Sequence, residues 1–271
     1  MMHCGSDSRY PPMQYIIDNH LGFESSKGST DTVNFLRKLI FVKISELSAD
    51  QIISTRDQAT FQMIPYNHFC FPMKTLAEQK DIILGGIIRI VHVPSNRNLK
   101  GTTIVLNAIN KLTERGHNFD FILLENKKNE DVLSELIKAD IVIDQPGNWV
   151  GRLAIEACAS NCAVIGGNLP RYTNRFDSPI IPFYKSSDKL LEILQNLVTN
   201  FDFLCLKKKC CYEFWQRNYS QTSYLEYFDK LLKNKSPKFK PLSNQKELLL
   251  KGSCNVIEKL FIYLFYKNNY D

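Results

Sequence analysis

The sequence of 271 residues lacks an apolar run long enough to cross a bilayer, since the longest, Leu260 to Tyr266, is far shorter than the roughly 20 residues required. The first ten residues are polar, so no secretory leader is expected. Charged residues make up 23% and hydrophobic residues 44% of the chain, which is ordinary for a folded protein and excludes a membrane bundle or wholesale disorder. The length predicts one large or two modest domains.

The eight cysteines lack the paired spacing of a zinc site. Cys158 and Cys162 fall in a predicted core helix and the strand after it, whereas Cys210 and Cys211 are adjacent in a lysine-rich helix. This distribution is not that of a disulfide framework. We therefore expect reduced thiols, a cytoplasmic location and no metal site.

Two phosphate-binding signatures are also absent. No Gly-x-Gly-x-x-Gly follows a predicted strand, and there is no Walker lysine motif. An enzyme that binds NAD or ATP on a Rossmann-like sheet is therefore the least supported function.

What the chain does contain, from residue 82 onward, is an alternation of strands and helices. Short apolar runs predict strands, and apolar residues at helical spacing predict the helices between them. The predicted strands are Ile87–Val93, Phe119–Leu124, Ile141–Ile143 and Ile180–Phe183; the predicted helices are Thr103–Arg115, one capped by Asn129, Ser187–Val198, Phe203–Arg217 and Gln221–Lys233. This order predicts a doubly wound parallel sheet covered by helices on both faces.

The first 80 residues predict a smaller α/β region. Helical spacing covers residues 31–42, a short apolar step follows at 49–54, and the first ten residues are expected to form a loop after a strand that the sequence does not contain. We expect domains at 1–80 and 81–218, followed by carboxyl-terminal helices and a basic tail at 219–271.

The stretch Asp140 to Gly167 is the first candidate ligand site. Its strand ends in Asp144 and Gln145, at the edge of a parallel sheet where ligands bind. Asn148 can cap the helix that follows, and Gly151 allows the backbone to approach a ligand closely. The amides of that helix end suit a phosphate or a sugar hydroxyl.

A second polar group, Ser95, Asn96, Arg97 and Lys100, follows the strand at 87–93. Arg97 could hold a diphosphate through a two-pronged hydrogen bond and Lys100 as a point charge. A solvated basic turn is the alternative for this loop taken alone. His92 is expected to be a polar strand-end residue rather than a ligand.

Two segments, HVPSNRNLKGT and GNWVGRLAIEACASNCAVIGG, resemble motifs of the group 1 (family 4-like) glycosyltransferases, the retaining GT-B enzymes that transfer sugar from a nucleotide donor. The first is similar to the family's Arg/Lys diphosphate loop and the second to its glutamate-bearing helix and following strand. HCGSD, from His3 to Asp7, resembles a His-Gly-x-Asp turn of the acceptor domain, with Cys4 inserted. The resemblance spans roughly Ser54 to Tyr227.

The resemblance implies a GT-B-like α/β fold: one complete Rossmann-like doubly wound parallel sheet with an incomplete amino-terminal α/β domain. It implies that Arg97 and Lys100 neutralise the leaving nucleoside diphosphate and that Glu156 holds the ribose hydroxyls. The donor would also be bound by Ser95, Asn96, Asp144, Gln145, Asn148 and Gly151, with His3 and Asp7 on the acceptor side. No cofactor is expected, because Arg and Lys can replace Mg²⁺ in this role.

Two departures from the family pattern leave two functions open. The larger is length, because the first of the family's two Rossmann-like domains is expected to lack its opening strands and helices here. The family has a glutamate eight positions before Glu156, where this chain has Asn148, and an amide cannot act as a charged acceptor or a nucleophile. The chain is expected to transfer sugar from a nucleotide-sugar donor to a glycan or lipid-linked acceptor in surface polysaccharide synthesis. The alternative is a remnant that binds nucleotide-sugar without transferring it.

The tail carries most of the net charge of +6, because eight lysines and three acidic residues lie between Lys233 and Asp271. With the apolar segment Val256–Tyr266, this composition indicates an interfacial helix at the inner face of an anionic membrane. The alternative is that this helix packs on the first domain. No nucleic-acid partner is expected, since arginine-rich clusters and known modules are missing.

Overall fold

The computed structural model describes residues 2–3, 32–54, 66–68, 86–98, 100–146, 150–167, 178–183, 186–233, 245–252 and 255–265. These residues belong to two compact units. The larger unit is Phe71–Phe228, and the smaller one joins Met1–Cys70 to Asp229–Asp271. The carboxyl-terminal helices therefore group with the amino-terminal residues.

The larger unit is built on a five-stranded sheet in which every strand pair is parallel. The strands are β4 (Ile88–His92), β5 (Phe119–Leu123), β6 (Ile141–Ile143), β7 (Ala163–Gly166) and β8 (Ile181–Pro182), in the spatial order β5-β4-β6-β7-β8. This arrangement confirms the doubly wound parallel sheet predicted from the sequence.

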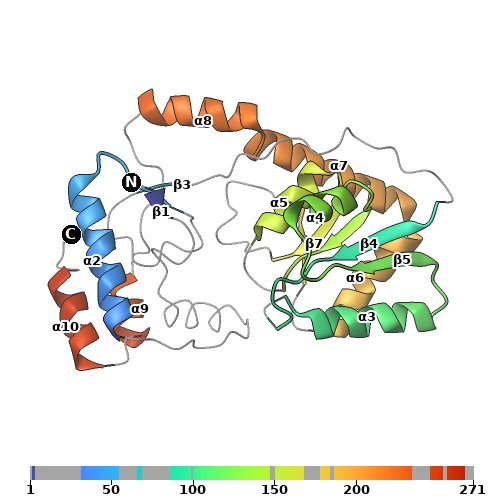
Figure 1. The fold of residues 1–271 in the computed structure, drawn as a ribbon, viewed down its shortest axis with the longest axis horizontal. Helices are drawn as coiled ribbons and strands as arrows, with labels where there is room; N and C mark the ends of the chain where they lie inside the picture. The colour runs from blue at the N-terminus through green and yellow to red at the C-terminus, as the bar shows by residue number, and fades with distance from the viewer. Residues whose placement is uncertain are drawn as a thin grey trace. The chain divides into compact units, whose positions relative to one another are not determined.

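Helices cover both faces of this sheet (Figure 1). The helices of the unit are α3 (Thr102–Glu114), α4 (Asn129–Leu136), α5 (Arg152–Ala159), α6 (Ser187–Thr199), α7 (Phe201–Asn218) and α8 (Gln221–Lys233), the last of which runs on past the unit's boundary. Alternate strand residues divide the core, because neighbouring side chains of a strand point to opposite faces. Val91 and Val142 pack in the cluster with α4, α5 and the carboxyl-terminal half of α7, and Ile90 and Ile141 pack in the cluster with α3 and α6.

The start of α4 differs from the prediction. Asn129 is the first helical residue rather than the cap, and the extended residue Lys128 precedes it without a side-chain capping bond. Glu130 and Asp131 lie in the first turn, where their negative charge interacts favourably with the helix dipole. A cap was predicted from residue type alone, but the acidic first turn compensates for its absence.

The connections that leave β4 and β6 run to opposite faces of the sheet. The chain after β4 enters α3, and the chain after the adjacent β6 enters α5, which belongs to the other core cluster. In open α/β sheets a crevice forms at the carboxyl ends of such a strand pair, where the winding direction changes, and ligands bind there. The topology thus indicates the loops after β4 and β6 as the candidate ligand-binding site.

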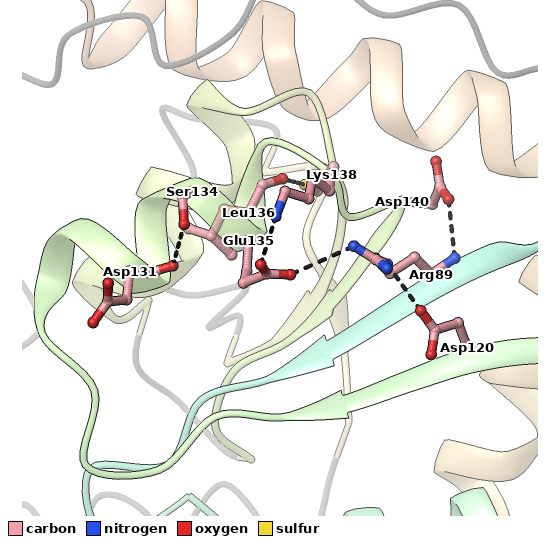
Figure 2. Close-up of polar contacts among 9 residues, drawn as sticks. Arg89, Asp120, Asp131, Ser134, Glu135, Leu136, Lys138 and Asp140 are labelled. Atoms are coloured by element: carbon pink, nitrogen blue, oxygen red, sulfur yellow. Dashed lines mark hydrogen bonds and ion pairs between the residues drawn. The ribbon is translucent and has the colours of Figure 1, made fainter.

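The opposite, amino edge of the same sheet carries a network of charged groups (Figure 2). The amide N–H of Arg89 donates to Asp140 Oδ2 at 3.0 Å, and its guanidinium donates to Asp120 Oδ2 at 3.0 Å and Glu135 Oε2 at 3.4 Å. Lys208 Nζ, almost fully buried, donates to Asp140 Oδ1 at 2.7 Å. Each of these side chains has a partner, so the edge is closed by ion pairs between strands and helices.

The smaller unit contains a parallel sheet of β1 (Met2–His3), β2 (Ile53–Ser54) and β3 (Asn67–His68), with β2 in the centre. The prediction of a loop at the start of the chain is wrong for Met2 and His3. They form a strand because their backbone pairs with β2, about fifty residues away in the sequence. A segment of two residues is too short to show an apolar pattern from which this pairing could be predicted.

The smaller unit also contains the helices α2 (Thr32–Ser48), α9 (Gln245–Gly252) and α10 (Val256–Phe265), and α10 packs against both α2 and α9 (Figure 1). Asn255 Nδ2 donates to Thr32 Oγ1 at 2.6 Å, and this hydroxyl donates to the buried Glu258 at 3.2 Å. The helix α10 therefore packs on the amino-terminal residues, which was the alternative predicted for the tail. Its other face leaves Val256, Leu260 and Leu264 more than half exposed.

Among the helices in the described part of the chain, none combines the length and the apolar character that crossing a bilayer requires.

Candidate functional site

The loop between β4 and α3 is a tight turn held by its own backbone. Lys100 N–H donates to the carbonyl of Asn96 at 2.9 Å, and Thr102 N–H donates to the carbonyl of Arg97 at 3.0 Å. Gly101 ends the turn with φ of +63°, and a Cβ built there would lie 3.0 Å from the Pro146 ring. Glycine is therefore required both for its left-handed backbone and for the close approach of the loop after β6.

Lys100 and Asp144 form an ion pair across the junction of β4 and β6, with Lys100 Nζ donating to Asp144 Oδ1. Only 13% of the Lys100 side chain is exposed, and Asp144 is completely buried. An ion pair thus joins the loops after β4 and β6. The sequence had indicated Lys100 and Asp144 as site residues of two separate loops.

Arg97 lies at the outside of the same loop and forms a two-pronged pair with Glu125. Its Nε donates to Oε1 at 2.8 Å and its Nη2 to Oε2 at 2.5 Å. The hydrogen bond from Arg97 lowers the pKa of Glu125. Glu125 was not predicted as a site residue from the sequence. It directly follows the predicted strand at 119–124, just as Asp144 directly follows the strand at 141–143, so the same signal could have found it.

Asp144 has one oxygen in the ion pair and one without a hydrogen-bond partner among the described residues. That oxygen, Oδ2, lies against Gly151, the residue that precedes α5. A Cβ on Gly151 would come within 2.4 Å of it. The backbone of Gly151 is in the ordinary extended region with φ of −73°, so lack of space, not conformation, requires glycine here.

Glu156 lies in the second turn of α5 and is 5% exposed. Its Oε1 accepts a hydrogen bond from Arg152 Nε at 2.9 Å. Burial raises the pKa of Glu156, and the negative charge of Asp144 raises it further, against the opposing effect of Arg152. The Asp144 charge therefore contributes to keeping the pKa of Glu156 above its ordinary value.

His92 is the last residue of β4 and is fully buried below the loop. Its Nδ1 lies 2.8 Å from the carbonyl oxygen of Ile143, which can only accept, so Nδ1 carries the hydrogen and Nε2 accepts from Thr102 Oγ1 at 3.0 Å. Burial lowers the pKa of His92, which favours this neutral form. The ring joins β4, β6 and the start of α3 in one arrangement.

The other predicted site residues are more dispersed. Ser95 and Asn96 are exposed in the first loop and Gln145 is half-buried after β6. His3 is in β1 of the smaller unit, while Asp7 and Asn148 lie outside the described residues. Across the described ranges, no group of three or more His, Cys, Asp or Glu residues is placed to hold a metal ion.

The described fold was compared with known proteins. No family model matches the sequence, and no curated protein matches it. Among solved structures, an alpha-glucosyltransferase in complex with UDP and a 13-mer DNA containing a HMU base is 13% identical, with a TM-score of 0.52 over 74% of this chain and 69% of that one. Anabaena Alr3699/HepE in complex with UDP and glucose is 12% identical, with a TM-score of 0.52 over 75% and 68%.

The fold is GT-B-like. A further similar structure, the carboxyl-terminal domain of a glycosyl transferase group 1 family protein (LpcC) from Francisella tularensis, is 18% identical over 50% of this chain and 89% of that one, with a TM-score of 0.40. The identities of 13% and 12% relate the chain to the alpha-glucosyltransferase and to HepE through the fold alone.

Proposed function

We propose that this chain is a retaining glycosyltransferase of the group 1, family 4-like type. It would transfer sugar from a nucleoside diphosphate sugar to a glycan or lipid-linked acceptor in surface polysaccharide synthesis. The observation that carries the proposal is the buried Lys100–Asp144 pair at the point where the winding of the sheet reverses. Arg97 on the same loop and the start of α5 add positive potential at that edge.

The chemistry needs positive charge where the leaving group forms. When the bond between the sugar and the diphosphate breaks, negative charge grows on the diphosphate. Cations fixed beforehand lower this barrier more than they strengthen ground-state binding. Lys100 is fixed by Asp144, and Arg97 and the amides near Gly151 would share the charge. The cations would serve in place of a divalent metal, so the proposal includes no cofactor.

Glu156 would accept hydrogen bonds from the ribose hydroxyls, with Ser95, Asn96, Gln145 and Asn148 around the donor. Two structures with the same fold contain UDP, which supports a uridine nucleotide as the first ligand to test. His3 and Asp7 would belong to the acceptor side.

The test is calorimetric titration of the whole chain with UDP, UDP-glucose and uridine. Arg97→Ala and Lys100→Ala are each expected to weaken UDP binding by about 1.5–3 kcal/mol, the range for hydrogen bonds to charged groups, and uridine binding much less. Lys111→Ala is the matched control, because Lys111 is an exposed lysine in the last turn of α3. UDP binding unchanged in both loop variants would contradict the assignment.

The remnant that binds but does not transfer remains the second candidate, because position 148 is asparagine where the family has glutamate. Titration and turnover separate the two. Binding of UDP-glucose together with release of UDP in the presence of glycan or lipid-linked acceptors supports the enzyme. Tight binding of UDP-glucose without release of UDP in the presence of any of these acceptors supports a remnant that binds the donor but does not transfer sugar.

We also propose peripheral contact with the inner face of an anionic membrane, through the exposed apolar face of α10. Leu260 and Leu264 are 54% and 57% exposed, with Lys259 exposed beside them. Leu260→Gln/Leu264→Gln should reduce sedimentation with anionic vesicles, while Leu225→Gln/Leu232→Gln, at exposed leucines of α8, should not. Equal sedimentation of all variants, or indifference to lipid charge, would remove this proposal.

Nucleic acid is not proposed as a partner, although one structure with the same fold contains DNA. A gel-shift measurement with duplex DNA at physiological salt tests this directly. A shift would add DNA to the acceptors to be assayed.

A further inference from the structure

We infer that Glu125 is a displaceable counter-ion of Arg97, and that competition between this carboxylate and the ligand's phosphate sets the anion affinity of the site. The inference rests on the proposed function, because it takes Arg97 to be a phosphate-binding residue. It assigns a specificity-determining role to Glu125, which lies after β5 and belongs to neither of the two loops discussed above.

The geometry of the pair is the first support. Glu125 receives two parallel hydrogen bonds, from Nε and Nη2 of Arg97, and therefore occupies one whole edge of the guanidinium. Phosphate oxygens bind arginine in the same two-pronged manner. A diphosphate that uses this edge must take the place of the carboxylate.

The second support is the contrast with the neighbouring pair. Asp144 is completely buried and Lys100 is 13% exposed, so their contact is fixed by the packing around it. The side chains of Arg97 and Glu125 are 57% and 29% exposed, so water can reach this pair and replace either partner. Ion pairs at such exposure contribute little to stability, so exchange of Glu125 for a phosphate has a low cost.

The competition favours ligands of high charge. A diphosphate offers more negative charge and more acceptor oxygens than the single carboxylate that it replaces. A weakly charged anion gains little from the exchange. Glu125 thus raises the threshold for binding at Arg97, while the Lys100–Asp144 pair keeps its geometry.

The experiment is titration of the whole chain with UDP at two salt concentrations, using Glu125→Gln, Glu125→Ala, Arg97→Ala and the double variant Arg97→Ala/Glu125→Gln. Both Glu125 variants are expected to bind UDP about two- to fivefold more tightly than the parent, the range of an exposed ion pair. Their binding should also fall more steeply with salt, since the site gains net positive charge. In the Arg97→Ala background the Glu125 substitution should have no effect.

Asp188→Asn is the matched control. Asp188 is an exposed carboxylate in the first turn of α6, and it pairs with Lys111 at 2.7 Å. Lys111 lies in the last turn of α3, at the end of the helix away from the loop. The Asp188 substitution changes the net charge equally and should leave UDP affinity unchanged.

The outcomes separate this inference from the proposed function. If the parent binds UDP and Arg97→Ala weakens it, but the Glu125 variants bind no more tightly than the parent, Glu125 merely positions Arg97 and the inference is overturned alone. If neither the parent nor the Glu125 variants bind UDP, both proposals are overturned. An equal gain in Asp188→Asn would show a general charge effect and would also overturn the inference.

Discussion

The two edges of the five-stranded sheet carry the same kinds of charged side chain but satisfy them differently. At the amino edge, Asp140 accepts with both oxygens, from the Arg89 amide (Figure 2) and from Lys208. At the carboxyl edge, Asp144 accepts from Lys100 with one oxygen, and its other oxygen has no partner in the described parts of the chain. A buried polar atom without a partner costs free energy, so the fold carries a cost at one edge that it avoids at the other.

This difference separates a structural network from a functional one. A network in which each group is satisfied stabilises the fold and needs no ligand. Sites of function are where proteins depart from complete local satisfaction. The amino edge should therefore govern stability and the carboxyl edge ligand binding, and the four predictions below test this division, from the largest expected effect to the smallest.

Asp140→Ala should destabilise the protein by about 3 kcal/mol, because it leaves the buried ammonium of Lys208 unpaired. Equilibrium unfolding in urea measures the change. Asp140→Ala/Lys208→Met should recover most of the loss, since no buried charge then remains. Lys138→Ala, which breaks the exposed pair with Glu135, is the control and should change stability by less than about 1 kcal/mol. A strong loss of UDP affinity in the folded Asp140 variant would contradict the division of roles.

Gly151→Ala should lower UDP affinity about tenfold and stability by about 1–3 kcal/mol, because its Cβ would displace Asp144 and with it Lys100. Gly166→Ala is the matched control. Its Cβ would lie 3.4 Å from Asp144 Cβ, an ordinary contact. Titration and thermal unfolding of both variants check the expectation, which fails if the two glycines respond alike.

Glu156→Gln should keep the fold and weaken ribonucleotide binding by about 1.5 kcal/mol more than binding of the 2′,3′-dideoxy analogue, since the carboxylate's proposed partners are ribose hydroxyls. Calorimetry with UDP and dideoxy-UDP makes the comparison. Equal losses for the two ligands would show that Glu156 acts through general electrostatics.

The pH dependence of stability should contain a small contribution from His92. Burial lowers the pKa of His92 below its ordinary value of 6.5, so the unfolded chain binds a proton that the folded chain does not. Its contribution is therefore intact above pH 6.5 and is lost as the pH falls toward the lower folded pKa. Urea unfolding between pH 7.5 and 5 should show a shallower decline in His92→Asn than in the parent. An identical slope would mean that folding does not lower the pKa of His92.

Local patterns in the sequence were sufficient for most of the fold. The helix Gln221–Lys233 has the predicted bounds, and the strands β4, β5, β6 and β8 begin and end within one residue of the predicted positions. These elements follow from apolar spacing, which depends only on neighbours a few positions away. The start of α7 was missed by two residues, because Asn200 caps Phe203 from outside the apolar pattern.

By itself, the sequence determined the parallel doubly wound sheet and the polar loops after β4 and β6, because hydrophobic periodicity and strand-end polarity are local properties. Only the tertiary structure decided which charges meet. Lys100 reaches Asp144 across 44 positions of sequence, and Arg97 reaches Glu125 across 28. Both pairs depend on the order of the strands, and the Lys100–Asp144 pair also depends on the space left by Gly151. Neither condition is encoded in the spacing of residues along the chain.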